Sequence, residues 1–154
     1  MNEVLYNAYV KILKEELLPA MGCTEPIAVA YAAALVRKTL GTIPQSAEVH
    51  VSANIIKNVK SVVVPHTGGM RGIDAAVAAG IIAGNADREL EVLSDVNEEE
   101  VRIMAHYLKQ TPISIAASDN GYIFDIQIRA NAGEHTAFVR IAGSHTNVNR
   151  VEKD

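Results

Sequence analysis

The single cysteine of the chain, Cys23, stands just before a segment whose pattern predicts a helix. A helix N-terminus stabilises a thiolate and lowers the pKa of the thiol, so Cys23 is a candidate nucleophile, base or metal ligand. A lone cysteine is more often a small buried apolar side chain, and its position leaves both interpretations open. One cysteine excludes an intramolecular disulfide and any zinc or iron–sulfur site built only from cysteines of this chain.

The second candidate is the glycine-rich stretch 65–72 (PHTGGMRG), which precedes a helix-like segment. Several glycines at such a place let successive backbone N–H groups converge on an anion, and Arg71 could hold a carboxylate through two parallel hydrogen bonds. His66 and Thr67 add polar groups. Alternatively, the glycines only supply the positive φ angles of a tight connection. Neither GxxxxGK[ST] nor GxGxxG occurs, which argues against a phosphate or dinucleotide site and leaves a small anion such as an amino-acid carboxylate open.

A second His-Thr pair, His145 and Thr146, could fold back toward that site or form an ordinary turn. His50 and His106 are expected on the surface. The spacings of zinc-protease helices and calcium-binding loops are absent, so we expect no complete metal site in this chain.

Hydrophobic spacing predicts the elements that must position these residues. Asn97 is the predicted N-cap of a helix that follows at 98–110. Asn120-Gly121 predicts a two-residue hairpin within an antiparallel meander at the end of the chain. The segment 54–64 is ambiguous, with a short strand possible at 61–64. The pattern predicts helices at 3–17, 26–40, 73–83 and 98–110, and strands at 47–53, 90–93, 113–117, 122–129, 137–142 and 148–151. This order indicates a two-layer α/β (α+β) sandwich with a mixed, largely antiparallel sheet.

Length and charge narrow the class of protein. The 154 residues suit a single domain, and 14 basic against 18 acidic side chains argue against a nucleic-acid binder. The longest apolar runs, 27–36 and 75–84, reach only half of the roughly 20 residues that cross a membrane. The N-terminal segment lacks the basic start and apolar core of a signal peptide, so we expect a cytoplasmic protein.

Ordered motifs give a resemblance to a known family. The segments 22–26 (GCTEP), 51–54 (VSAN) and 65–72 are together similar to the L-cysteine desulfidase family, also described as serine dehydratase alpha-like proteins. The segment 143–147 (GSHTN) resembles the family's next motif. The resemblance covers essentially the whole chain.

The resemblance implies an oxygen-sensitive iron–sulfur lyase that needs no pyridoxal phosphate. Members convert L-cysteine to pyruvate, ammonia and sulfide, and some deaminate serine instead. A [4Fe–4S] cluster held by three cysteines would leave one iron open as a Lewis acid. The resemblance makes Cys23 a base or a ligand. The residues expected to contact a small amino-acid substrate are Asn54, His66, Thr67, Gly68, Gly69, Met70, Arg71, His145 and Thr146.

Length is the main departure from that family, whose members are far longer and carry their cluster cysteines in a C-terminal helical domain. The chain is therefore expected to be the N-terminal domain, similar to the beta-type domain of serine dehydratases, with the missing C-terminal domain and a second copy as partners. Alone it is expected to be inactive. Its strand-like end at Asp154 fits an interrupted chain as well as a natural terminus.

Two alternatives remain open from the residues. One is a regulatory or dimerisation module that binds a small carboxylate without catalysis, in which Cys23 is buried and inert. The other is a stand-alone thiol enzyme, which requires Cys23 and His66 within hydrogen-bond reach.

Overall fold

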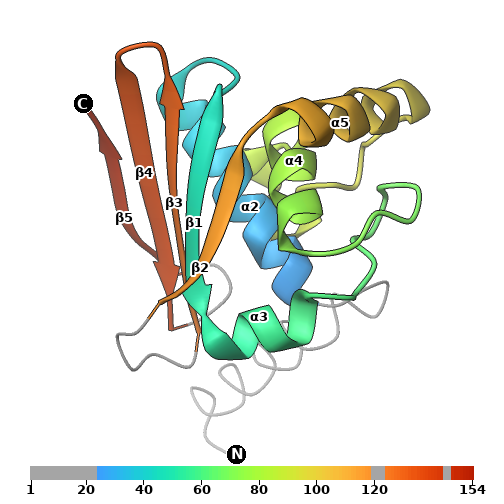
Figure 1. Ribbon diagram of the computed structural model, residues 1–154, viewed down its shortest axis with the longest axis horizontal. Helices are drawn as coiled ribbons and strands as arrows, with labels where there is room; N and C mark the ends of the chain where they lie inside the picture. Colours follow the sequence, from blue (N-terminus) through green and yellow to red (C-terminus); the bar gives the residue numbers. More distant parts are fainter. Residues whose placement is uncertain (1–23, 119–123, 144–146) are drawn as a thin grey trace, which may run out of the picture.

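The computed structural model describes residues 24–118, 124–143 and 147–154. A five-stranded sheet forms one layer and helices cover one of its faces (Figure 1). The strands are β1 (Ser46–Ser52), β2 (Ile113–Ser118), β3 (Asp125–Ala132), β4 (His135–Ala142) and β5 (Val148–Lys153). Their order in the sheet is β2-β1-β3-β4-β5, with β1 and β2 parallel and the other neighbours antiparallel. The predicted α+β fold with a mixed sheet is confirmed.

The predicted hairpin between the segments 113–117 and 122–129 is wrong. β2 and β3 are consecutive in the chain, but β1 lies between them and pairs with both. The apolar residues of β1 fit a place inside the sheet, since Val49 and Val51 are at most 1% exposed. The turn residues Asn120 and Gly121 lie outside the described residues.

The helix layer consists of α2 (Thr24–Leu40), α3 (Ala53–Val59), α4 (Ile73–Ala83) and α5 (Glu98–Gln110). Small residues bring α2 and α4 very close together. A Cβ atom built on Gly80 would lie 2.1 Å from the carbonyl oxygen of Ala30, and one on Gly84 would lie 2.8 Å from Cβ of Ala34. The alanine-rich sequences of both helices therefore serve a tight helix–helix contact over the sheet.

The start of α5 follows the local sequence. The side chain of Asn97 accepts a hydrogen bond from the amide of Glu100 at 2.8 Å, and the side chain of Glu100 accepts one from the amide of Asn97 at 3.1 Å. This reciprocal capping box satisfies two donors that a helix end otherwise leaves open. The predicted N-cap is confirmed.

The strand predicted at 90–93 is wrong, because a 3₁₀ helix, η2 (Ala86–Glu91), and a turn take its place. Asn85 closes this segment on itself: its side chain accepts from the amide of Asp87, and its own amide donates to the carbonyl of Val92. Val92 and Leu93 still enter the core, at 2% and 1% exposure, but from a turn.

Residues 53–59, which the sequence left ambiguous, form α3. The possible strand at 61–64 reduces to a single bridge between Val63 and Arg71. The helix predicted at 3–17 lies outside the described residues.

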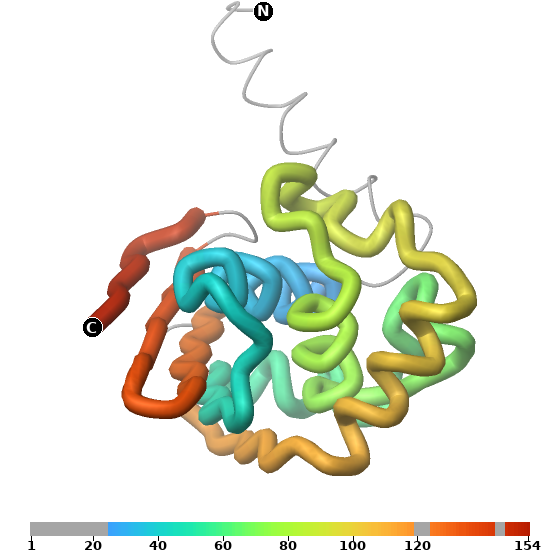
Figure 2. Tube along the Cα trace, turned by 90° about the horizontal axis from the view of Figure 1, so that it is seen from above, coloured from blue at the N-terminus to red at the C-terminus, as the bar shows by residue number. Residues whose placement is uncertain are grey.

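The core is aliphatic and lies between the helix layer and the facing side of the sheet. Alternation along β3 and β4 sends Ile126, Ile128, Val139 and Ile141 into this core, all at 0% exposure. The opposite face of the sheet carries polar residues, and no helix of the described residues covers it (Figures 1 and 2). Among the described residues, no helix is both long and apolar enough to cross a membrane.

Candidate functional site

The glycine-rich stretch 65–72 forms a closed loop between Val64 and α4. The amide of Val64 donates to the carbonyl of Met70 at 2.8 Å, and the amide of Gly72 donates to the carbonyl of Val62 at 3.2 Å. These bonds flank the bridge between Val63 and Arg71 and give the loop a fixed base. The loop also packs on α5, because a Cβ on Gly68 would lie 3.1 Å from Cγ1 of Val101.

Thr67 braces this loop from inside. Its hydroxyl donates to the carbonyl of Val64 at 2.7 Å and accepts from the amide of Met70 at 3.1 Å, and the residue is 1% exposed. Both hydrogen-bonding roles of the hydroxyl are thus filled within the loop. In this conformation Thr67 holds the loop in shape, and the exposed residues around it are the ones that can meet a ligand.

The tip of the loop presents backbone donors to solvent. Gly68 and Gly69 are exposed, with φ of 71° and 98°, and within the described part of the chain neither amide has an acceptor. His66 is also exposed and has a φ of 64°, a conformation that a residue with a Cβ adopts at a cost of about 1–2 kcal/mol. Amides next to residues in the left-handed region can form a concave anion site.

Arg71 is the cation of the loop. Its Nη1 donates to the carbonyl of Ser61 at 2.7 Å, and the residue is exposed. One guanidinium has five N–H donors, so this bond orients the side chain and leaves capacity for a carboxylate. Asn54 is exposed in the first turn of α3, whereas Ser61 follows the far end of that helix, so Asn54 and the carbonyl that Arg71 binds belong to opposite ends of α3.

Three predicted site residues, Cys23, His145 and Thr146, lie outside the described residues. The sequence places Cys23 immediately before Thr24, the first residue of α2. The proposed Cys23–His66 pair therefore stays a prediction.

A buried polar cluster that the sequence did not reveal lies on the sheet face away from the helices. Asp125, at 0% exposure, accepts hydrogen bonds from Ser118 Oγ at 2.8 Å, Gln127 Nε2 at 2.9 Å and Arg140 Nε at 2.9 Å. Ser52 stands between Ser118 and the β3 strand in the sheet, and among the described residues its buried hydroxyl has no partner. Alternation marks these residues only as the polar face of strands, and nothing in the sequence signals that they would be buried together.

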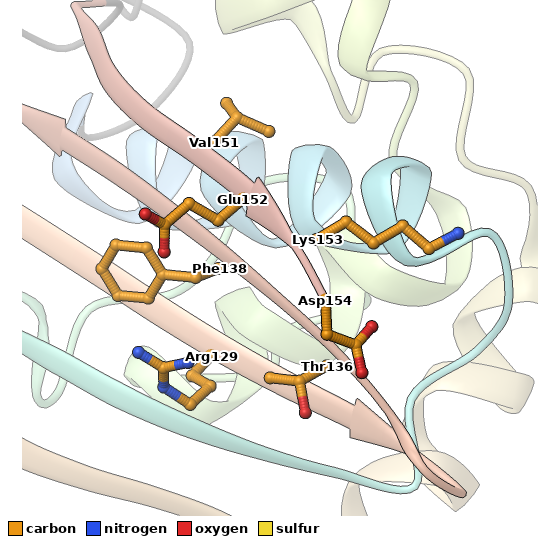
Figure 3. Close-up of a pocket in the computed structure, with 7 residues that line it drawn as sticks. All are labelled: Arg129, Thr136, Phe138, Val151, Glu152, Lys153 and Asp154. Atoms are coloured by element: carbon orange, nitrogen blue, oxygen red, sulfur yellow. The ribbon is translucent and has the colours of Figure 1, made fainter.

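The farther end of the same sheet face holds an open pocket (Figure 3). Phe138 is one of its lining residues, and two guanidinium groups lie over its ring, with Cζ of Arg129 5.0 Å and Cζ of Arg150 5.6 Å from the ring centre. Such cation–π contacts hold the arginines along the ring. The rim includes Glu152 and Asp154 as well as Arg129 and Lys153, so the pocket has no dominant charge.

The described residues contain no group of three or more His, Cys, Asp and Glu side chains able to hold a metal ion.

Comparison with known proteins places the chain among relatives of undefined activity. No protein-family model matches it. It is 50% identical over 149 residues to a UPF0597 protein of Desulfitobacterium hafniense, which covers 97% of this chain and 35% of the relative. UPF0597 proteins of Treponema denticola and Fusobacterium nucleatum are 45% and 43% identical, over 97% and 99% of this chain. The chain thus spans about a third of the length of these relatives, namely 35–36%.

These relatives correct the family membership expected from the motifs. Their name, UPF0597, states no activity, and it replaces the L-cysteine desulfidase and serine dehydratase family as the group to which this chain is similar. The descriptions lyase, L-cysteine desulfidase and [4Fe–4S] protein therefore find no support in the relatives. The motif segments are short, and identity over nearly the whole chain outweighs them.

Proposed function

We propose that this chain is a ligand-binding domain of a longer protein, and that the 65–72 loop binds the carboxylate of a small amino acid. The exposed amides of Gly68 and Gly69, in a loop braced by Thr67, carry the proposal. Two neighbouring amides suit the two oxygens of a carboxylate. Because the loop is already closed by its own hydrogen bonds, a ligand does not have to order it first.

Arg71 is the proposed partner of the same carboxylate. Its bond to the Ser61 carbonyl holds the guanidinium at the base of the loop, and the residue is exposed. Charge-assisted hydrogen bonds of this kind are about twice as strong as neutral ones. His66, exposed at the start of the loop, is available for a polar group of the ligand.

Titration of the chain with L-serine, L-cysteine and acetate, followed by NMR, tests this proposal. We expect the amide signals of Gly68 and Gly69 to shift with each ligand. We expect Arg71→Gln to weaken binding by about tenfold or more, as for loss of a hydrogen bond to a charged group. Arg88→Gln, a change of an exposed arginine on η2, is the matched control and should bind normally. Unchanged loop signals at millimolar ligand would overturn the proposal.

We further propose that the longer protein is an enzyme that acts on the bound amino acid by β-elimination. Elimination would release sulfide from L-cysteine or water from L-serine, and hydrolysis of the resulting aminoacrylate would give pyruvate and ammonia. The observation in favour is that Cys23 directly precedes α2, a helix of 17 residues whose N-terminal end favours a thiolate able to accept the α-proton.

An iron–sulfur cluster does not fit the residues of this chain. Such clusters are held by three or four thiolates, and the chain has one cysteine. We therefore assign no step to a cluster, and any such group would be held by residues outside this sequence.

Anaerobic assays of pyruvate release from L-cysteine and L-serine test the elimination proposal. The full-length protein should release pyruvate, and Cys23→Ala should abolish this release, whereas the 154-residue chain alone should be inactive. If the full-length protein released pyruvate from neither amino acid, β-elimination would be excluded while binding at the loop would stand on its own titration.

A further inference from the structure

β2 and β5, the two edge strands, are the least covered strands of the sheet. Residues 114–117 are all exposed, on both faces of the strand. Ile115 is opposite Val49 of β1 and faces the helix layer with it, yet Ile115 is 39% exposed and Val49 is 1% exposed. The helix layer therefore ends short of β2 and leaves an isoleucine of the inner face in solvent.

The two edges of the sheet are built differently. β5, at one margin, carries Arg150, Glu152 and Lys153, and charges of this kind discourage pairing of an edge strand with another chain. β2, at the other margin, has the sequence ISIAAS, with no charge and no proline (Figure 2). Among the described residues, no strand pairs with its outer side. An uncharged, apolar, unpaired edge is a template for another strand.

The hydrogen-bonding groups on this free edge can be assigned. The carbonyl of Pro112 accepts from the amide of Ala47 in β1, so it points toward β1. Backbone groups of a strand alternate in direction, and those of Ser114 and Ala116 therefore also point toward β1. The N–H and C=O groups of Ile113, Ile115 and Ala117 point outward.

We propose that a second copy of this chain pairs with β2 in an antiparallel manner, about a two-fold axis at Ile115. In this register Ile115 faces its own copy, and Ile113 of each chain faces Ala117 of the other. All outward N–H and C=O groups of the three residues then find partners, and each large side chain meets a small one or its own symmetry mate. The result is one continuous sheet through both copies, a closed isologous contact.

The proposed partner of the β2 edge, a second copy of this chain, is argued from the charge and the extent of that edge. A copy of β2 brings no like charges to the contact, since the strand has none. A six-residue strand alone, about 20 Å long, supplies less than the roughly 800 Å² per partner of a stable interface. The contact therefore needs apolar area beyond β2, and the exposed isoleucines on neighbouring segments of the chain are Ile103 of α5, at 46% exposure, and Ile43, at 44%.

This contact is independent of the ligand proposed for the 65–72 loop, since the two use different elements. Light scattering and sedimentation of the 154-residue chain should give twice its mass of 16.5 kDa. Ile115→Lys should return the mass to that of one chain, because it places charges face to face on the axis. Val151→Lys is the matched control: Val151 is 49% exposed on the opposite edge strand, and its variant should stay dimeric. Circular dichroism of each variant verifies folding.

Hydrogen exchange distinguishes this register from any other dimer. On concentration, the amides of Ile113, Ile115 and Ala117 should gain protection, and those of Ser114 and Ala116 should not change. In a Cys23→Ser background, Ile115→Cys should form an intermolecular disulfide on oxidation, since Cα atoms of a directly opposite pair lie about 5.5 Å apart. The proposal would be overturned if the wild-type chain stayed monomeric at all concentrations, or if the dimer were insensitive to Ile115→Lys. It would also be overturned if β2 were protected in a monomeric full-length protein. The last result would assign the edge to a strand of the same polypeptide.

Discussion

Arg140 Nε donates a 2.9 Å hydrogen bond to Oδ1 of Asp125, a carboxylate with no exposed surface. It lies on the side of the sheet that none of the described helices covers (Figure 1). A carboxylate is expensive to bury unless charged and polar partners compensate it. Ser118 and Gln127 donate to its other oxygen. The first residue of β3 is thus tied to β2 and β4 at one end of the sheet.

Removal of the arginine of this pair should destabilise the fold strongly. We expect Arg140→Met to lower the free energy of unfolding by about 3 kcal/mol or more, because the buried charge of Asp125 loses a compensating partner. The matched control is Arg150→Met, the residue directly opposite in β5, whose ion pair with Glu152 is solvent-exposed and worth at most about 1 kcal/mol. Urea denaturation measures both, and equal losses would contradict this account of the cluster.

The brace of the glycine-rich loop gives a second prediction. Thr67→Val keeps the shape of the side chain but leaves the amide of Met70 without its acceptor, so we expect a loss of about 1–3 kcal/mol and faster exchange of that amide. Thr67→Ser retains the hydroxyl and should keep the amide protected. Hydrogen exchange by NMR checks both. Slow exchange of the Met70 amide in Thr67→Val would show that the hydroxyl does not hold the loop.

Gly80→Ala tests the contact between α2 and α4. In an open helix position this change gains up to about 1 kcal/mol, but here the new Cβ would lie 2.1 Å from a backbone oxygen of Ala30. We expect a net destabilisation of about 1–3 kcal/mol, because the helices must move apart. Gly133→Ala is the control: it meets nothing within 4 Å and pays only for its φ of 60°. A stabilised Gly80→Ala in thermal melts would mean that the two helices are more loosely packed.

The buried phenol of Tyr107 should make the stability of the fold depend on pH in the alkaline range. Burial raises the pKa of its phenol above the usual value of about 10, and its hydroxyl donates to the carbonyl of Pro44. The unfolded chain then loses this proton first, so stability is fully present below about pH 10 and falls as the pH rises toward the folded pKa. Burial raises the pKa of Tyr31 in the same way. Tyr107→Phe should flatten the fall in unfolding free energy above about pH 10. An unchanged slope would assign the fall to other groups.

Local signals predicted the parts of the fold that depend on neighbouring residues. The start of α5 follows from its capping box, and the glycine-rich loop with α4 follows from a run of glycines before small apolar residues. Local pattern predicts a strand at 90–93, whereas η2 and a turn form there, because the hydrogen bonds of Asn85 that close this segment form only once the turn exists. The candidate loop was found from its residue types, but the internal role of Thr67 required the positions of Val64 and Met70.

By itself, then, the sequence determined the α+β class, the capped α5 helix and the loop ahead of α4, because capping, turn and amphipathic preferences act within a few residues. The tertiary structure decided that β1 lies between β2 and β3, that Asp125 is buried with Ser118 and Arg140, and that β2 forms an uncharged edge. Those features depend on which strands pair across long separations. Pairing is set by the summed burial of all strands against the helix layer, and no single segment encodes it.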